Sequence, residues 1–326
     1  MNILGIETSC DETAAAVVRD GQNILSNVVA SSLTEHKKYG GIIPEIASRR
    51  QIEWINSVVS SALTAARLRL RDVDAIAVTV KPGLIGSLLV GISYARALSH
   101  AARKPLIEVD HIKAHLYANC LRGAAQNSLK SFLTPQLPAI GLVISGGHSS
   151  VFYVKTFRDY RLLGQTRDDA AGEAFDKVAR ILGLGYPGGP AIDRLSRKGV
   201  NTQIRFPSAR LPGSYDFSFS GVKTAVLYYH REHKNRHDYS VPKIAYAFQD
   251  SVVTALIDKC ITACVKKKVK TLLMGGGVAA NSNLRNRLAQ EAQRHEIEVY
   301  FPPLNLCLDN AAMIAGLGFH LKSERR

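Results

Sequence analysis

Two histidines four residues apart, His111 and His115, are the side chains in this sequence best placed for chemistry. They follow the mainly apolar run 105–109, which predicts a strand. If the next segment is helical, side chains at i and i+4 share one face, and both imidazoles can bind one metal ion at the strand's carboxyl end. A metal-assisted reaction is therefore the first hypothesis. A pair of ordinary surface or core histidines is the alternative.

The histidine pair lacks the residue that would indicate a zinc protease. In the H-E-x-x-H motif the glutamate beside the first histidine is the general base. Here Ile112 occupies that position. A thermolysin-like protease is therefore disfavoured.

Asp309 is a candidate for a third metal ligand. It lies at the predicted start of the last helix, where a carboxylate is a favourable N-cap, so a purely structural role is one interpretation. If this helix returns to the first half of the chain, Asp309 can face the histidine pair. Two imidazoles and one carboxylate suit iron(II) or zinc and leave coordination positions open for a substrate.

Two segments of the chain repeat one pattern. Residues 2–18 and 139–154 each run from an apolar strand, through a turn of small or polar residues, into a second apolar strand. Each segment predicts a hairpin whose tip exposes N–H or hydroxyl groups. The repetition indicates an internal duplication.

Three glycine-rich loops could hold a phosphate or a nucleotide. In loop 145–149 two glycines let backbone N–H groups approach an anion and serines add hydroxyl donors, although a tight turn without ligand is equally compatible. In loop 274–281, Asn281 could bind a nucleoside or cap the next helix. In loop 186–193, between two helices, Asp193 could bind a ribose or only expose a charge. None has the G-x-G-x-x-G spacing of a dinucleotide site.

The remaining periodicity alternates between helix and strand, so we expect an α/β protein with mixed sheets formed by strands of both halves. Apolar residues recur at helical spacing between Ile52 and Ala66. Further helices are predicted at 88–101, 170–182, 190–197, 241–267 and 282–294, with a last helix from Asp309, and further strands at 73–80, 271–274 and 298–301.

Composition narrows the classes of protein. The 326 residues include 42 Lys and Arg against 27 Asp and Glu, a net charge of +15 that favours nucleic acid or nucleotide partners, unless it only solvates the surface. The basic clusters at 37–38, 49–50, 67–71, 266–270 and 285–294 have little aromatic interleaving, which argues against a stacking RNA-recognition module.

Other sequence features argue against export and membrane insertion. No apolar run approaches the ~20 residues of a membrane helix. Acidic residues at 7, 11 and 12 do not fit a signal peptide. Five cysteines, an odd number without C-x-x-C, indicate neither a disulfide framework nor a zinc ribbon. We therefore expect a cytoplasmic protein with reduced thiols.

Taken together, six ordered motifs resemble the TsaD family of tRNA threonylcarbamoyladenosine transferases, formerly labelled glycoproteases. The resemblance extends from Met1 to the last helix. The motifs are Gly5-Ile-Glu-Thr-Ser-Cys-Asp-Glu-Thr13, His111-x-x-x-His115, Ser145-Gly-Gly-His148, Asp169-Ala-Ala-Gly-Glu-Ala-Phe-Asp-Lys177, Tyr186-Pro-Gly-Gly-Pro190 and Gly275-Gly-Gly-Val-Ala-Ala-Asn281.

The resemblance implies the duplicated two-lobe fold shared by actin, sugar kinases and heat-shock chaperones (ASKHA), with a nucleotide cleft. Residues 1–133 and 303–326 would form the lobe with the metal site, and residues 134–302 the lobe with most of the nucleotide site. The family pattern implies metal ligands His111, His115 and Asp309 for one divalent ion, iron(II) or else zinc. It places threonylcarbamoyl-AMP against Val143, Ile144, Ser145, Gly146, Gly147, Asp176, Gly189, Asp193 and Asn281.

The reaction implied by the resemblance transfers the threonylcarbamoyl group of threonylcarbamoyl-AMP to N6 of the adenosine 3′ to the anticodon. The tRNAs are those that read codons starting with adenine, and AMP is released. Partners similar to TsaB and TsaE are expected in the cytoplasm. Asp11 and Glu12, at the first hairpin tip, are our candidates for orienting the amine or taking its proton.

Two departures from the family pattern concern residues outside the implied ligand set. Loop 145–149 has a serine where threonine is frequent, and the stretch 122–136 is unusual in length and composition. An ASKHA ATPase or sugar kinase is the main alternative, although such an enzyme would not need the two histidines. A metalloprotease and a non-catalytic scaffold similar to TsaB are further alternatives.

Overall fold

The structure is a computed structural model that describes residues 1–123, 134–200, 202–209, 211 and 213–322. Most of the unusual stretch 122–136 lies outside the described residues. The chain divides into two compact units. Unit 1 comprises Met1–Pro135, Phe157–Asp159 and Pro302–Arg326, and unit 2 comprises Gln136–Thr156 and Tyr160–Phe301.

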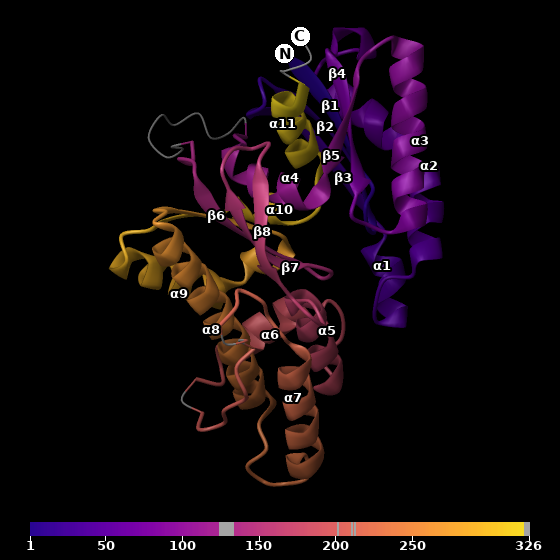
Figure 1. The fold of residues 1–326 in the computed structure, drawn as a ribbon. Helices are drawn as coiled ribbons and strands as arrows, with labels where there is room; N and C mark the ends of the chain where they lie inside the picture. The colour runs from indigo at the N-terminus through magenta and orange to yellow at the C-terminus, as the bar shows by residue number, and fades with distance from the viewer. Residues whose placement is uncertain (124–133, 201, 210, 212, 323–326) are drawn as a thin grey trace. The chain divides into compact units, whose positions relative to one another are not determined.

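Unit 1 is built on a five-stranded mixed sheet with the order β3-β2-β1-β4-β5 (Figure 1). The first hairpin is confirmed, because β1 and β2 pair antiparallel, with Glu7 opposite Ala14 beside the tip. The strand β3, which the sequence pattern did not indicate, extends this meander, and β4 and β5 add parallel to β1. The strands are β1 (Asn2–Glu7), β2 (Glu12–Arg19), β3 (Asn23–Ser31), β4 (Ala75–Lys81) and β5 (Leu106–Asp110).

Unit 2 is built on a second five-stranded sheet with the order β10-β9-β6-β7-β8. Read from the other edge, this order places β6 where unit 1 has β1, with two antiparallel strands on one side and two parallel strands on the other. The predicted internal duplication is therefore confirmed. The strands are β6 (Ala139–Ile144), β7 (Ser149–Val154), β8 (Tyr160–Gln165), β9 (Thr271–Gly275) and β10 (Glu298–Tyr300).

Successive side chains of the strands point to opposite faces of the sheet and fill two separate cores in unit 1. On β1, Ile3 packs with α11 on one face, whereas Leu4 and Ile6 pack with α2 and α3 on the other. Both faces of the central strands are covered, so β1 and β4 are apolar at most positions. The helices of this unit are α1 (Leu33–His36), α2 (Pro44–Ala65), α3 (Ile85–Ala102), α4 (His111–Tyr117), α10 (Leu304–Cys307) and α11 (Ala311–Lys322).

The helices of unit 2 follow the predicted pattern closely, with one exception. The predicted bounds of α8 (Val241–Lys267) and α9 (Ser282–Arg294) are reproduced, and α5 (Ala171–Ile181) and α6 (Gly188–Ser196) differ by one or two residues at each end. The helix α7 (Ser220–His233) was missed. Only Val222 and Val226 are buried on it, which leaves almost no apolar periodicity.

Two further expectations can be compared with the described residues. All five cysteines are free. No helix within the described ranges combines the length and the apolar character needed to cross a bilayer.

Gly5 allows α11 to lie directly on the central strand of unit 1. A Cβ atom added to Gly5 would lie 2.4 Å from the carbonyl oxygen of Ala311 and 2.9 Å from the Cβ of Ala315. Any side chain here would push the helix away from the sheet. This close approach fixes where the segment before α11 lies.

We expect Gly5→Ala to lower the free energy of unfolding by about 1–3 kcal/mol, because α11 must move to admit the methyl group. Gly221→Ala is the matched control, since a Cβ at Gly221 would meet no heavy atom within 4 Å. Alanine there should be neutral or slightly stabilising in the helix. Urea denaturation measures both, and equal stability of the two variants would contradict the close contact.

Asp168 fixes the start of α7. Its carboxylate accepts hydrogen bonds from the backbone N–H groups of Phe219 and Ser220 and from the hydroxyls of Ser218 and Ser220. Burial acts to raise the pKa of Asp168, but these hydrogen bonds outweigh burial and lower the pKa below its ordinary value. The stabilisation is therefore present above the unfolded-state pKa of about 3.9 and is lost as pH falls below it.

We expect Asp168→Asn to weaken the dependence of the melting temperature on pH between about pH 5 and pH 2, because a group that titrates on unfolding is removed. Thermal melts of wild type and variant across this range measure the effect. Parallel melting curves for the two proteins at every pH would contradict the assignment.

Candidate metal centre

The two histidines lie on α4, which begins directly where β5 ends. The side chain of Asp110, the last residue of β5, caps this helix by accepting a hydrogen bond from the N–H of Lys113 at 3.2 Å. His111 and His115 are therefore one turn apart on the same face, as predicted, and both are buried.

Asp309 reaches the histidines because its neighbour takes over the role of helix cap. The side chain of Asn310 accepts a hydrogen bond from the N–H of Met313 at 3.1 Å, and α11 begins at Ala311. The interpretation of Asp309 as the N-cap is therefore wrong. Its carboxylate is left available to face α4.

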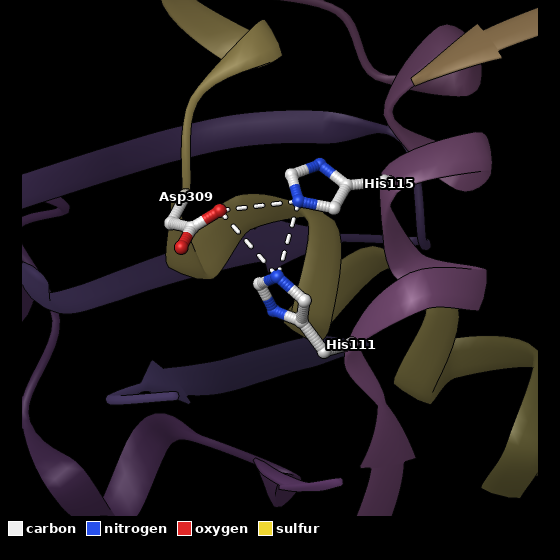
Figure 2. Close-up of side chains that lie close together, drawn as sticks. All are labelled: His111, His115 and Asp309. Atoms are coloured by element: carbon white, nitrogen blue, oxygen red, sulfur yellow. Dashed lines mark hydrogen bonds and ion pairs between the residues drawn. The ribbon is translucent and has the colours of Figure 1, made fainter. Parts of the chain in front are cut away.

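The three side chains point toward a common centre (Figure 2). An oxygen of Asp309 lies 3.1 Å from Nε2 of His115 and 3.4 Å from Nε2 of His111, and the two Nε2 atoms are 3.1 Å apart. Atoms bound to one ion at about 2.1 Å lie about 3.0–3.4 Å apart at right or tetrahedral angles. The spacing and the donor types therefore fit one divalent metal ion, and the cluster is a possible metal site.

Glu7 fixes the orientation of His111. An oxygen of its carboxylate lies 3.0 Å from Nδ1 of His111 and also accepts a hydrogen bond from the hydroxyl of Thr79. Because an ionised carboxylate can only accept, Nδ1 carries a proton, and Nε2 is the ring nitrogen directed at the common centre. This carboxylate–histidine arrangement is typical of the residues behind a metal ligand.

The sequence analysis missed the role of Glu7. The available signal was a carboxylate at the end of an otherwise apolar strand, where burial without a partner would be costly.

His115 lacks a corresponding partner. Its Nδ1 atom is fully buried and has no hydrogen-bond partner among the described residues. Burial is the main cause that lowers the pKa of His115 below its ordinary value. A neutral imidazole is the form that binds a metal ion.

The charges of the cluster are strongly interdependent. Burial acts to raise the pKa of Asp309, but the charge of His111 and hydrogen bonds from both histidines outweigh burial and hold the pKa well below its ordinary value. Burial likewise opposes protonation of His111, yet Glu7 and Asp309 raise its pKa well above the ordinary value. The carboxylates of Glu7 and Asp309 thus favour a positive charge at this centre.

The hairpin tip between β1 and β2 presents the two other acidic candidates of unit 1. The side-chain amide of Gln51 on α2 lies 3.3, 2.9 and 3.1 Å from the carbonyl oxygens of Thr8, Cys10 and Glu12, which holds the tip in place. Burial, followed by the charges of Asp309 and Asp11, raises the pKa of Glu12 well above its ordinary value. Glu12 is therefore close enough to sense the charge of the cluster.

The corresponding hairpin tip of unit 2 contains the glycine-rich loop 145–149. Val143 and Ile144 are buried strand residues, and their side chains are not accessible. A Cβ atom at Gly146 or Gly147 would meet no heavy atom within 4 Å, so the backbone of this loop is open on one side. The carbonyl oxygen of Ser145 accepts a hydrogen bond from the N–H of Gly172, which fixes the loop on α5.

Asp176 is directed at the start of α6. Its carboxylate accepts a hydrogen bond from the N–H of Gly188 at 2.7 Å. The pKa of Asp176 is raised above its ordinary value, because the effect of burial outweighs that of the hydrogen bonds from Gly188 and Gly189, which lower it. A Cβ atom at Gly189 would again meet no heavy atom within 4 Å.

Asp193 and Asn281 both contribute to the start of α9. The predicted loop 186–193 overlapped the predicted helix 190–197, and Asp193 lies in the helix α6. Its carboxylate accepts hydrogen bonds from the N–H and hydroxyl of Ser282. Asn281 caps α9 by accepting from the N–H of Leu284, and its amide donates to Gln249. Both side chains therefore have structural partners.

Comparison with known proteins identifies the family of the chain. Residues 23–316 match the family model of TsaD, tRNA N6-adenosine threonylcarbamoyltransferase. A tRNA N6-adenosine threonylcarbamoyltransferase of Clostridium botulinum is 49% identical over 329 residues, which cover 100% of this chain and 94% of the relative. The chain belongs to the TsaD family. A relative of the same name from Caldicellulosiruptor saccharolyticus is 48% identical over 98% of this chain and 92% of its own length. The resemblance predicted from the motifs is thus confirmed, and TsaD is a family of transferases.

Solved structures confirm the predicted architecture of this TsaD chain. HypF from T. kodakarensis matches with a TM-score of 0.66 and 16% identity, over 98% of this chain and 48% of that chain. Component A of the (R)-2-hydroxyglutaryl-CoA dehydratase of Acidaminococcus fermentans matches with a TM-score of 0.55 and 16% identity, over 98% of both chains. At this identity the likeness shows the fold alone, which is the duplicated ASKHA fold.

We expect the purified protein to contain about one divalent metal ion per chain, and Asp309→Ala and His111→Ala to lose most of it, because two remaining ligands hold an ion weakly. Glu7→Gln should weaken metal affinity by about 10- to 100-fold, since the ligand His111 loses its orienting carboxylate. Elemental analysis and metal titration measure these changes. His100→Ala, at an exposed position of α3, is the control. Full metal content in both ligand variants would contradict the site.

Proposed function

We propose that this chain transfers the threonylcarbamoyl group of threonylcarbamoyl-AMP to N6 of an adenosine in tRNA, with release of AMP. The observation that carries the proposal is the 49% identity to a tRNA N6-adenosine threonylcarbamoyltransferase, which extends over the whole chain. The family implied by the sequence motifs, and the cluster of His111, His115 and Asp309, agree with it.

In this proposal His111, His115 and Asp309 hold one divalent ion, iron(II) or zinc, in unit 1. When bound, such an ion supplies Lewis-acid chemistry and a template for substrate oxygens. Glu7 holds a proton on Nδ1 of His111 and so directs Nε2 toward the ion, and Asp309 contributes the negative charge that offsets the ion. Imidazole and carboxylate donors suit both iron(II) and zinc, so both ions are named.

The adenylate is proposed to bind on unit 2, at residues 143–147, Asp176, Gly189, Asp193 and Asn281. The open backbone at Gly146, Gly147 and Gly189 supports this assignment, because a phosphate or ribose can approach N–H groups there without meeting a side chain. Val143 and Ile144 would contribute through their backbone. Asp176, Asp193 and Asn281 would act mainly by fixing the starts of α6 and α9, which their hydrogen bonds support.

Asp11 and Glu12 are proposed to orient the attacking amine or to accept its proton. An exocyclic aryl amine is a weak nucleophile, so a fixed orientation next to the electrophile contributes more than a strong base. The three contacts of Gln51 with the tip support such an orienting role.

We further propose that the chain acts in the cytoplasm with partners similar to TsaB and TsaE. The lobe boundaries at residues 133–134 and 302–303 belong to the same proposal, with the metal site on the first lobe and most of the adenylate site on the second. The net charge of +15 supports a polyanionic substrate such as tRNA.

We expect a reconstituted reaction with unmodified tRNA, threonine, bicarbonate, ATP and the partner proteins to form threonylcarbamoyladenosine. His111→Ala and Asp309→Ala should each reduce the rate at least about 100-fold through loss of metal and positioned substrate. His100→Ala should behave as wild type. The nucleoside product is quantified by mass spectrometry after digestion of the tRNA.

Two results would contradict the proposal. Equal product formation by all variants would eliminate the metal site from the reaction. A wild type that forms no modified adenosine but rapidly phosphorylates a sugar would instead support the ASKHA kinase alternative.

A further inference from the structure

In the basic clusters 49–50, 67–71 and 285–294, several arginines are paired with carboxylates. A pair of opposite charges has no net charge, which reduces its attraction for another anion. The pairs are Arg49 with Glu45, Arg50 with Glu35 and Glu53, Arg69 and Arg71 with Asp72, Arg287 with Asp250, and Arg294 with Glu291.

A different group of cations lies where α6 ends and α8 begins, and we name it the α6–α8 basic surface. It consists of Arg194, Arg197, Lys198 and Lys243, all of which are exposed. Arg197 lies 3.6 Å from Asp193, whose carboxylate is already occupied by Ser282. Arg194, Lys198 and Lys243 have no carboxylate within ion-pair distance in the described part of the chain.

The backbone holds these cations in a fixed arrangement. Arg194 lies in the last turn of α6, and Arg197 and Lys198 follow in the turn directly after the helix. The N–H of Lys198 donates a hydrogen bond to the carbonyl oxygen of Leu195, which fixes this turn. A Cβ atom at Gly199 would lie 2.0 Å from the carbonyl oxygen of Pro242 and 2.8 Å from the N atom of Lys243, so the chain after Lys198 runs directly against the first turn of α8. The amide of Gln249 on α8 also donates to the hydroxyl of Ser196 on α6.

Helix electrostatics do not account for this surface. Cations near the end of α6 interact favourably with the helix dipole, but neighbouring like charges repel each other. Lys243 lies in the first turn of α8, where the dipole disfavours a cation. Lys243 therefore destabilises α8. An external anion bound to the surface would relieve the repulsion among its four cations.

The position of the surface indicates which anion it binds. The surface begins at Arg194, directly after Asp193 on the helix that also carries Gly189. Asp193 and Gly189 both belong to the proposed adenylate site. The adenosine that attacks the adenylate must come to this place, so the phosphates that flank it must lie nearby. Phosphate contacts by exposed Arg and Lys position a nucleic acid without reading its sequence.

We propose that the α6–α8 basic surface binds the phosphate backbone of the tRNA beside the adenosine to be modified. This inference rests on the proposed function and adds the place where the tRNA is held. In this proposal the surface holds phosphates of the tRNA and not the threonylcarbamoyl group, so its residues are positioning residues.

The test uses the triple variant Arg194→Gln, Lys198→Gln, Lys243→Gln, which leaves Arg197 and its contacts to Asp193 and Ser282 in place. The matched control is Lys266→Gln, Lys267→Gln, Lys268→Gln, which removes the same charge at the other end of α8, about 35 Å from Lys243. Binding of labelled, unmodified tRNA to the purified full chain is measured at several salt concentrations. Binding of AMP and the melting temperature are measured on the same samples.

We expect the α6–α8 variant to bind tRNA at least about 10-fold more weakly near 0.1 M salt. The slope of log K against log salt concentration should become less negative by about 2, because each of the three lost phosphate contacts contributes about 0.7. The control should stay within about 2-fold of wild type at this salt concentration. AMP binding should be unchanged in both variants. The melting temperature of the α6–α8 variant should equal or slightly exceed that of wild type, because the repulsion among these cations is removed.

Two results would contradict the proposed tRNA-binding role of the surface and leave the proposed function intact. The first is unchanged tRNA binding by the α6–α8 variant while wild type binds and modifies tRNA. The second is an equal loss in the control, because net charge would then explain the effect. A wild type that neither binds nor modifies tRNA would overturn the proposed function together with the surface.

Discussion

The contact between the first strand and the last helix is the constraint on which the metal centre depends. Gly5 has no side chain, so α11 lies against β1 with the carbonyl oxygen of Ala311 at the place where a Cβ would be. The segment that precedes α11 is thereby brought to the carboxyl end of β5, where α4 begins. Asp309 and His115 are 194 positions apart in the sequence, yet their side chains are 3.1 Å apart. Asn310 completes this arrangement, because it caps the helix and leaves the aspartate available.

The two sheets show how one topology can support two kinds of chemistry. Each begins with an antiparallel hairpin and continues with two parallel strands, and in each the hairpin tip follows the central strand. In unit 1 the tip carries carboxylates, and Glu7 at the end of β1 orients a histidine. In unit 2 the tip carries glycines and serines, whose backbone is open. The duplication therefore gives the two loops corresponding positions, and their residue types differ in the way that the proposed cation site and the proposed anion site require.

Much of this fold follows from the sequence because its signals are local. The apolar hairpins and the helix 241–267 have strong periodicity. The spacing of His111 and His115 alone predicts that they share one face of a helix. The features that were missed depend on distant partners. The helix α7 has two buried valines and is held at its start by Asp168, some fifty positions earlier in the chain. The division of roles between Asp309 and Asn310 also depends on tertiary contacts, because either side chain can cap a helix.

The order of the proposed ligands along the chain has a consequence for biosynthesis. Both histidines leave the ribosome long before Asp309, and the helix α11, which places Asp309, packs on β1, which is made earlier than either histidine. A site that needs all three side chains can therefore form only after Asp309 has been made and α11 has packed on β1. In the proposed metal site, binding of the ion would thus be a late step in maturation.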